Sequence, residues 1–345
     1  MVTIRDIARL SGFSVTTVSR ALNNHDDVSS NTKKIIQSIA NREEYAPNML
    51  AKGLVSQDSK TFGFITSNLQ ETSPMDNFTF LLFMKSLERA NILGYDIVMI
   101  HYNTEIHKNK TFQQIISERN LTGAILQGFD KSDDLCQEAL ESDIPTVFID
   151  IGLSNESSGY VVSNIDKAAD IGFDFLLNEC GYQNMVFVFG SIESWVTSQW
   201  QVAVKKAQAK YHRKLKSFDS INGHYKLDLA QEALRNHSDL IYKEKLAFFC
   251  ASDLMGIGIM RGLKEFNKSV PQDIGILGYD GIDITQYVTP TLSTIRQFPD
   301  ELGAQTVNLL IEIKNRNQEN VSHCLSDIDV KLVRRDSTRR VHSDD

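Results

Sequence analysis

The hydrophobic positions in the first 45 residues repeat at helical spacing in three short stretches. Thr3 is placed to cap the first helix, and Gly12 ends it. A second helix is expected from Val15 to about Leu22, and a third opens at Ser30 or Asn31. Their apolar positions are Ile4, Ile7, Ala8 and Leu10, then Val18, Ala21 and Leu22, then Ile35, Ile36, Ile39 and Ala40. Three short helices with a glycine turn between the first two are typical of a helix-turn-helix unit.

Beyond residue 60, short apolar runs typical of strands alternate with helical stretches. The expected strands are Phe62–Thr66, Ile97–His101, Ala124–Leu126, Thr146–Ile149, Val161–Val162, Val186–Phe189, Ala247–Ala251 and Ile274–Leu277. The expected helices include Phe78–Leu93, Thr111–Arg119, Asp166–Leu177 and Leu254–Phe266. Repeated strand–helix units predict parallel sheets covered by helices. Because this region is long for one open sheet and its pattern weakens at Leu153–Tyr160, we expect two lobes.

The composition is that of a folded protein with two or three domains: 345 residues, 41% hydrophobic and 23% charged. No apolar run approaches the roughly 20 residues of a membrane helix. The N-terminus, MVTIRDIARL, carries charges where a signal peptide has its apolar core, so we expect a cytoplasmic protein. The four cysteines lie far apart and form no CxxC, as expected of small buried thiols in a reducing compartment.

The net charge of −8 argues against binding to nucleic acid, but the charge is not evenly distributed. Residues 1–60 contain eight basic and six acidic side chains, a net +2 that leaves −10 on the rest of the chain. A mildly basic head on an acidic body is weak evidence taken alone. This distribution makes the helical head, rather than the acidic body, the candidate for DNA binding.

The exposed face of the second predicted helix carries Val15, Thr16, Ser19 and Arg20. The second helix of a helix-turn-helix lies in the major groove, with its N-terminal side chains at base edges. Hydroxyl groups reach phosphates, Val and Thr methyl groups contact the thymine methyl, and Arg binds guanine through two hydrogen bonds. The alternative is the solvated face of a small helical bundle.

This head strongly resembles the DNA-binding head of the lactose/galactose repressor (LacI) family. The matching elements are T-I-x-D-I-A at 3–8, S-x-x-T-V-S-R at 14–20, N-x-x-x-x-V-S at 23–29, Thr32, Y-x-P-N at 45–48 and A-x-x-L at 51–54. The resemblance implies that Val15, Thr16 and Arg20 read bases. It implies supporting DNA contacts from Thr3, Ser14, Thr17, Ser19, Asn23, Asn48 and Ala51. Residues 48–56 would be a hinge helix whose Leu54 wedges between base pairs in the minor groove, unless Leu54 is an ordinary linker residue.

The resemblance continues at lower density over the rest of the chain. It is carried by G-A-I-L at 123–126, S-D-L-M-G-I-G at 252–258, V-P-Q-D-I-G-I-L-G-Y-D at 270–280, T-P-x-L-S-T-I-R-Q at 289–297 and V-R-R-D-S-T at 333–338. It implies an all-α helix-turn-helix head (1–46), a hinge and linker (47–60), and an α/β two-lobed periplasmic-binding-protein-like domain (61–345). With crossings near 160, 290 and 322, the N-terminal lobe would hold about 61–160 and 290–322. The C-terminal lobe would hold about 162–289 and 323–338.

Polar residues follow several predicted strands, at the sheet edge where open α/β sheets bind ligands. They are Gln127, Asp166, Ser252, Asp253 and Asp280. As alternatives, Asp166 and Asp253 suit helix N-caps, and Asp280 suits a turn. The resemblance implies that these residues contact an effector, since they match sugar-binding positions in the family and their polar groups suit vicinal hydroxyls. Asn77 and Phe78 are expected to contribute from the N-terminal lobe.

One position departs from the family pattern. Sugar sensors of the family carry an Arg in R-x-x-G-F/W, and here W-Q-V-A-V places Trp200 at the Arg position. Trp200 could stack on the apolar face of a pyranose, or it could fill a pocket that no longer binds the usual ligand. Trp195, the only other tryptophan, lies in the same segment.

The sequence predicts a DNA-binding regulator rather than an enzyme. It has no GxSxG, P-loop or HExxH, and His101 and His107 have no partner at a familiar zinc spacing. We therefore expect no cofactor and no metal, and a homodimer that binds operator DNA and a small-molecule effector, with a sugar as the expected effector. The alternative function is a solute-binding sensor without operator-specific DNA binding.

Overall fold

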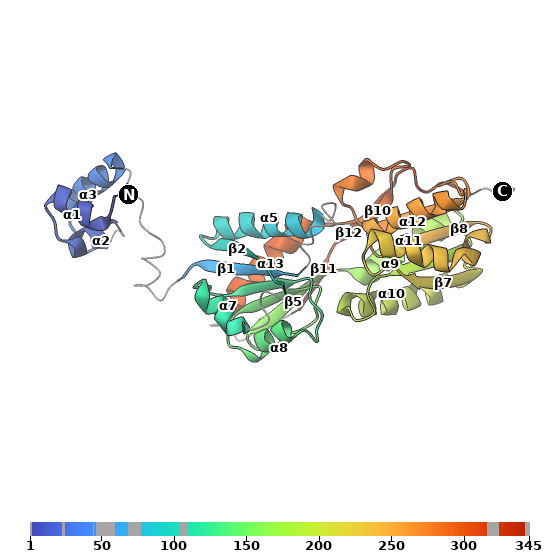
Figure 1. Ribbon diagram of the computed structural model, residues 1–345, viewed down its shortest axis with the longest axis horizontal. Coiled ribbons are helices and arrows are strands. Elements are labelled where there is room, and N and C mark those ends of the chain that lie inside the picture. Colours follow the sequence, from blue (N-terminus) through green and yellow to red (C-terminus); the bar gives the residue numbers. More distant parts are fainter. Residues whose placement is uncertain are drawn as a thin grey trace. The chain divides into compact units, whose positions relative to one another are not determined.

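The computed structural model describes residues 2–22, 25–43, 45, 59–67, 77–103, 110–315 and 324–341. The chain divides into two compact units, Met1–Ser59 and Lys60–Asp345. The described part of the first unit contains α1 (Ile4–Ser11), α2 (Val15–Leu22) and α3 (Ser30–Arg42), the three helices that the hydrophobic pattern predicts (Figure 1). Their shared core is built from Ile7, Ala8, Val18, Ala21, Val28 and Ile36.

Local chemistry explains where the helices of the head begin and end. Thr3 and Asp6 form a reciprocal capping box at the start of α1. Gly12 follows α1 with φ of 73°, a left-handed conformation that glycine adopts without a steric penalty. This turn directs α2 away from α1 and packs the buried Val18 against the buried Ile7.

The second unit contains two six-stranded sheets. The first consists of β1 (Thr61–Thr66), β2 (Asp96–His101), β3 (Ala124–Gln127), β4 (Thr146–Ile149), β5 (Ser158–Ser163) and β11 (Cys324–Ile328), in the order β11-β5-β4-β3-β1-β2. The second consists of β6 (Asn184–Phe189), β7 (Ser217–Asn222), β8 (Leu246–Cys250), β9 (Ile274–Asp280), β10 (Ser293–Gln297) and β12 (Val330–Val333), in the order β12-β10-β9-β8-β6-β7. Neighbouring strands are parallel except β12, which runs antiparallel to β10.

Helices cover both faces of each sheet, and each sheet with its helices forms one lobe (Figure 1). In the N-terminal lobe, α5 (Asn77–Ile92) and α13 (Pro299–Asn315) lie on one face, and α7 (Phe112–Glu118) and α8 (Asp134–Glu141) on the other. In the C-terminal lobe, α9 (Ile165–Asp174) and α10 (Trp195–Tyr211) pack together, as do α11 (Leu227–Asn236) and α12 (Asp253–Glu265). A π-helical turn, η1 (Phe175–Glu179), extends α9, and two short 3₁₀ helices are η2 (Ser238–Tyr242) and η3 (Asp283–Gln286).

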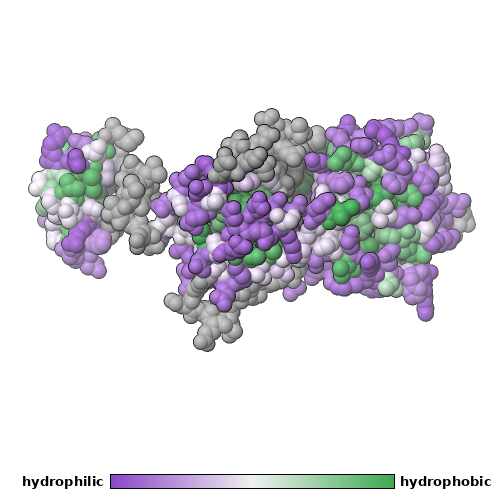
Figure 2. All heavy atoms as spheres, turned by 60° about the horizontal axis from the view of Figure 1, so that its bottom comes forward, coloured by the Kyte–Doolittle hydropathy of each residue, from purple (hydrophilic) through white to green (hydrophobic). Residues whose placement is uncertain are grey.

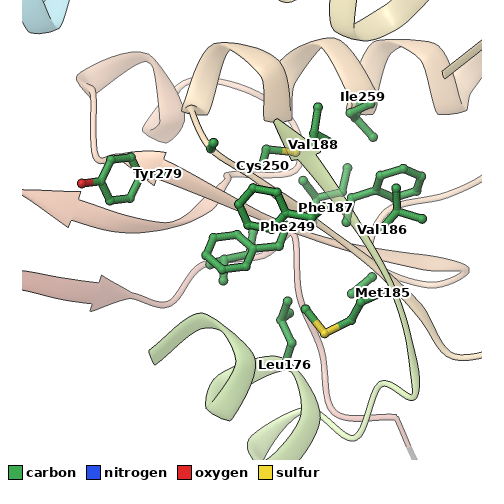
Figure 3. Packing of buried hydrophobic residues seen from close by; sticks show 14 of the residues in the cluster. Leu176, Met185, Val186, Phe187, Val188, Phe249, Cys250, Ile259 and Tyr279 are labelled. Atoms are coloured by element: carbon green, nitrogen blue, oxygen red, sulfur yellow. The ribbon is translucent and has the colours of Figure 1, made fainter. Parts of the chain in front are cut away.

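The core of the C-terminal lobe is rich in aromatic side chains. Figure 3 shows Phe187, Phe249 and Cys250 packed between sheet and helices, while the Tyr279 hydroxyl points away from them. The described surface in Figure 2 is mostly hydrophilic, with small hydrophobic patches. Among the described helices, none has the length and apolar character needed to span a membrane.

The chain passes between the two sheets three times. The crossings lie between β5 and α9, between β10 and α13, and between β11 and β12. The crossing expected near 160 falls at 163–165, but those expected near 290 and 322 fall at 297–299 and 328–330. Contrary to the expectation, β10 pairs with β9 and belongs to the C-terminal lobe, and β11 pairs with β5 and belongs to the N-terminal lobe. Strand pairing, rather than the local sequence pattern, decides the sheet to which each strand belongs.

Candidate DNA-binding face and effector site

The outward face of α2 presents the predicted base-reading side chains. Val15, Thr16 and Arg20 are exposed, and Val15 retains 43% of its accessible surface. On the opposite face, Val18 and Ala21 are fully buried in the core of the head. A rigid helix with one anchored face and one face of Val, Thr and Arg side chains matches what readout in the major groove requires.

The N-terminal ends of α2 and α3 open into one shallow groove of about 310 Å³. Ser14 caps α2 by accepting a hydrogen bond from the Thr17 amide at 3.1 Å, and Ser29 caps α3 in the same way through Thr32 at 3.2 Å. Helix N-termini attract phosphate oxygens. The groove therefore suits the DNA backbone contacts predicted for Ser14 and Thr17, both of which line it. Thr3 is exposed on the same unit, and Ser19 is half-buried.

Arg20 forms an ion pair with Asp27, which lies between α2 and α3. Both side chains remain about half exposed, at 55% and 50%. An exposed pair of this kind contributes little to stability. Its effect is to restrict the orientation of the guanidinium beside the groove while leaving it accessible to DNA.

Four predicted DNA contacts cannot be placed. Asn23, Asn48, Ala51 and Leu54 lie outside the described residues, as does the expected hinge helix. Their roles stay predictions.

In the second unit, the carboxyl ends of strands from both sheets meet at a set of polar side chains. The Ser163 hydroxyl at the end of β5 donates to Gln297 Oε1 at 2.6 Å, and Gln297 Nε2 donates to Asp280 Oδ1 at 2.8 Å. Ser163 also hydrogen bonds with the Tyr279 side chain. We call the group made of Gln127, Asp150, Ser163, Tyr225, Tyr279, Asp280 and Gln297 the inter-lobe site.

Gln127 lies at the end of β3, as predicted, and is mostly buried. Its Oε1 accepts hydrogen bonds from Thr66 at 2.9 Å and from Thr79 at 3.4 Å. These contacts tie the ends of β1 and β3 to the start of α5. Phe78, also predicted, is buried in the N-terminal core with 9% of its surface exposed. Asn77 begins α5, and its side chain lies outside what the structure describes.

Asp150, directly after β4, is the main residue that sequence reasoning missed. It adopts a left-handed conformation with φ of 60°, which is uncommon outside glycine and turns its side chain out of the strand. Burial raises the pKa of Asp150 to about 7. Burial raises the pKa of Tyr225 and of Tyr279, and the nearby charges of Asp150 and Asp280 raise it further. The signal that could have found Asp150 is a carboxylate immediately after the apolar run Thr146–Ile149.

Tyr225 and Trp195 bring two aromatic rings to the inter-lobe site. Tyr225 also has a positive φ, of 58°, and its hydroxyl lies 2.9 Å from that of Thr197. Trp195, at the start of α10, packs edge to face on Tyr160 of the N-terminal lobe at 5.2 Å between ring centroids. The ammonium of Lys131, also from the N-terminal lobe, lies 5.2 Å from the centre of the Trp195 ring.

Trp200 lies in the hydrophobic core, with 1% of its surface exposed. Its ring contacts Phe187, Phe249 and Tyr279 at centroid distances of 5.3, 5.7 and 4.9 Å. Of the two alternatives for this position, the burial favours a side chain that fills the pocket over one that stacks on a sugar.

The carboxylates of Asp166 and Asp253 are both bound to other groups of the protein. Asp166 is exposed and pairs with Lys206 at 2.7 Å. Asp253 is fully buried, and its Oδ2 accepts hydrogen bonds from the amides of Gly281 and Ile282 at 2.7 and 2.9 Å. Ser252 caps α12 through the Met255 amide at 3.2 Å. We therefore assign Asp166 to its ion pair with Lys206 and Asp253 to the turn after β9, and keep Ser252 and Asp280 as candidate contacts.

Within the described part of the chain, no group of three or more His, Cys, Asp or Glu side chains is arranged to hold a metal ion. The polar groups of the inter-lobe site are carboxylates, amides and hydroxyls, which are hydrogen-bonding groups rather than a metal-ligand set.

A head of this form and a two-lobed sheet domain together define a DNA-binding regulator with a periplasmic-binding-protein-like sensor. The model for bacterial regulatory proteins of the lacI family matches residues 3–48, and the model for a periplasmic binding protein-like domain matches residues 175–338. The chain belongs to the lacI family, which confirms the resemblance and the predicted fold class.

Curated relatives and solved structures agree with this assignment. The probable HTH-type transcriptional repressor ExuR of Bacillus subtilis (strain 168) is 30% identical over 346 residues, covering 99% of each chain. The HTH-type transcriptional repressor PurR of Vibrio campbellii (strain ATCC BAA-1116) is 26% identical, covering 92% of this chain and 94% of that one. The structure of the lac repressor dimer bound to operator and the anti-inducer ONPF superimposes with a TM-score of 0.79 at 23% identity, covering 98% of this chain and 99% of that one. The chain is a transcriptional regulator rather than an enzyme.

Replacing Asp253 by Ala is expected to lower the free energy of unfolding by about 2–4 kcal/mol, because two buried amides lose their acceptor. The matched control is Asp166→Ala, which removes an exposed carboxylate and is expected to change stability by about 0.5 kcal/mol or less. Urea denaturation of both variants measures the difference. Equal stability of the two variants would contradict the role assigned to Asp253.

Replacing Asp150 by Asn is expected to change how stability depends on pH. The pKa of Asp150 in the folded state, about 7, lies above the ordinary value of 3.8, so the folded protein holds a proton that the unfolded chain releases between those values. The wild type therefore loses stability as pH rises through that range, and Asp150→Asn does not. Melting temperatures at pH 5 and pH 8 should show the variant gaining a few °C relative to the wild type at the higher pH. Asp143→Asn, at an exposed position just before β4, is the control, and a pH-independent difference for Asp150→Asn would refute the assignment.

Proposed function

We propose that this protein is a homodimeric repressor that acts in the cytoplasm, binds operator DNA through its paired heads, and changes operator affinity when a sugar binds at the inter-lobe site. The main supporting observation is that α2 exposes Val15, Thr16 and Arg20 on one face while its opposite face is buried in the core of the head. The contacts at the ends of β3, β5, β9 and β10 supply the polar groups for the effector.

Related structures support a sugar as the class of effector. They include a CelR–cellobiose complex, a lacI-family regulator from Enterococcus faecium with bound ribose, and a regulator from Alkaliphilus metalliredigens with D-xylulofuranose. Each superimposes on this chain with a TM-score of at least 0.66. A ligand shifts operator affinity only to the extent that it binds the DNA-bound and the free arrangements with different affinity.

Arg20→Ala is expected to weaken binding to the operator by about 10- to 100-fold per head, since a bidentate contact to guanine contributes about 1–3 kcal/mol. Binding to unrelated DNA should change far less. A gel-shift titration with promoter fragments and random duplex measures both affinities, and calorimetry checks that effector binding is unchanged. The control is Arg9→Ala, which removes an exposed head cation outside α2.

That titration also tests the alternative, a solute sensor without operator-specific binding. If the wild type binds no promoter fragment more tightly than random duplex at moderate salt, the repressor assignment fails.

The two tryptophans give a direct readout of effector binding. Trp195 lies beside Lys131 and Tyr160 of the opposite lobe, whereas Trp200 is enclosed in the core. We expect effector to change the intrinsic fluorescence through Trp195, so Trp200→Phe should retain the change and Trp195→Phe should lose it. If Trp195→Phe retains the full change, the ligand binds elsewhere.

A further inference from the structure

One cavity of the sensor lies away from the inter-lobe site, at the opposite edge of the sheet of the C-terminal lobe. It has a volume of about 250 Å³ and lies where β6, β8 and β9 begin. Since the carboxyl ends of these strands face the other lobe, their amino ends lie at the outer end of the C-terminal lobe (Figure 1). We call this cavity the distal pocket, and its polar lining includes Tyr182, Lys243, Lys245, Lys268 and Arg339.

The basic side chains of the distal pocket are less exposed than its acidic ones. Four lining residues are basic and half-buried: Lys243, Lys245, Lys268 and Arg339. The two acidic lining residues, Glu244 and Asp273, are exposed, and Asp273 accepts a hydrogen bond from the Ser269 amide at 2.7 Å. Charges act more strongly on one another where water is partly excluded. The interior of the pocket is therefore more positive than its rim.

Two of the basic side chains contact neighbouring groups of the lobe. Lys243 forms an ion pair with Asp219 of β7. The Lys268 ammonium lies 5.3 Å from the centre of the Tyr242 ring, which attracts a cation without cancelling its charge. Tyr242 itself keeps 70% of its surface exposed. The lining thus places a cation beside an accessible aromatic ring.

The chain segments around the distal pocket concentrate positive charge in an acidic protein. Segments 212–216, 243–245, 267–273 and 339–341 contain eight basic side chains and two acidic ones, whereas the chain as a whole has a net charge of −8. Backbone hydrogen bonds hold two of these segments together, because the Lys216 amide donates to the Gln183 carbonyl at 2.7 Å and the Gln183 amide donates to the Lys245 carbonyl at 2.9 Å. Charge of one sign around a concave surface attracts ligands of the opposite sign.

The floor of the distal pocket is rigid and uncharged. Tyr182 is buried, and its ring packs so closely on Gly275 that no side chain would fit at that position. Its hydroxyl accepts a hydrogen bond from the Arg339 amide at 3.3 Å. Burial raises the pKa of Tyr182 to about 12, so the phenol adds no negative charge at neutral pH. A pre-formed pocket avoids the cost of ordering its walls when a ligand binds.

We propose that the distal pocket binds a small phosphate monoester, with the phosphate held by Lys245, Lys268 and Arg339 and the organic part against Tyr242. Lysine and arginine are the usual donors to phosphate, which carries between one and two negative charges at neutral pH. The enclosed volume favours a metabolite over nucleic acid, which binds along extended basic grooves. The site is separate from the inter-lobe site, so the proposal holds whether or not a sugar binds there.

The test is a titration of the full-length protein at pH 7.5, followed by calorimetry and phosphorus NMR. The probes are ribose 5-phosphate and AMP, their uncharged counterparts ribose and adenosine, and inorganic phosphate. We expect at least one ester to bind about tenfold or more tightly than its counterpart, because hydrogen bonds between charged groups are strong. If neither ester binds more tightly than its counterpart, the proposal is overturned. If inorganic phosphate binds as tightly as the esters, the assignment to a monoester is overturned.

Variants locate the binding. Lys245→Gln combined with Lys268→Gln should weaken binding of the ester about tenfold or more. The matched control, Lys205→Gln with Lys264→Gln, removes two exposed cations from helices of the same lobe and should leave the affinity unchanged, as should Asp280→Asn. Urea denaturation verifies that each variant folds. Equal loss in both double variants, or loss only in Asp280→Asn, would place the binding outside the distal pocket and overturn the proposal.

The same double variants distinguish a nucleic acid from a small ligand. A short duplex of random sequence is titrated against the wild type and both variants. If the loss of Lys245 and Lys268 weakens duplex binding and leaves the affinity for the ester intact, the basic surface serves nucleic acid and the proposal fails. We expect the opposite result, a loss of ester binding with duplex binding unchanged.

Discussion

The three short crossings between the sheets constrain everything else in the sensor. β5 and β10 each leave their sheet at the carboxyl end, and β12 begins opposite Gln297, at the carboxyl end of β10. β11 ends beside the end of β5. All three connections therefore join the same edge of one sheet to the same edge of the other, and the carboxyl ends of both sets of strands must face each other. A ligand at that edge contacts both lobes, which is the physical basis for coupling its binding to a change in lobe arrangement.

The helical head could be predicted from the sequence because its determinants are local. Caps at Thr3 and Ser29, the left-handed turn at Gly12 and the spacing of Ile7 and Val18 depend on neighbours a few residues away. The central strands could be predicted equally well, since all their residues except Gln127 and Thr146 are apolar. The edge strand β7 was not, because Ser217–Asn222 is polar and half exposed. The lobe assignments of β10 and β11 depend on partners far away in the sequence, which no local pattern reveals.

In the candidate site, too, some residues could be predicted from local sequence and others depend on the folded backbone. Gln127, Ser252 and Asp280 were predicted from the sequence because each directly follows or ends an apolar strand. Asp253 looked equivalent to Ser252 in sequence, yet its carboxylate turns inward to the amides of the turn after β9. Asp150 and Tyr225 reach the site through left-handed backbone conformations, which a pattern of residue types does not encode. The sequence thus identifies the edge of the sheet, and the backbone decides which side chains at that edge are available.

Trp200 links the hydrophobic core of the C-terminal lobe to the polar inter-lobe site through its contact with Tyr279. Trp200 packs edge to face on Tyr279, and the hydroxyl of Tyr279 reaches Ser163 at the first crossing. From Ser163 the hydrogen bonds continue through Gln297 to the Asp280 carboxylate. An arginine at position 200 would bring a charged guanidinium to the buried cluster of Phe187, Phe249 and Tyr279, where its desolvation would be costly without a carboxylate or an anionic ligand to pair with. The indole removes that cost and the cation together. Trp200 therefore joins the apolar packing of the C-terminal lobe to the hydrogen bonds at the first crossing without placing a charge in the core.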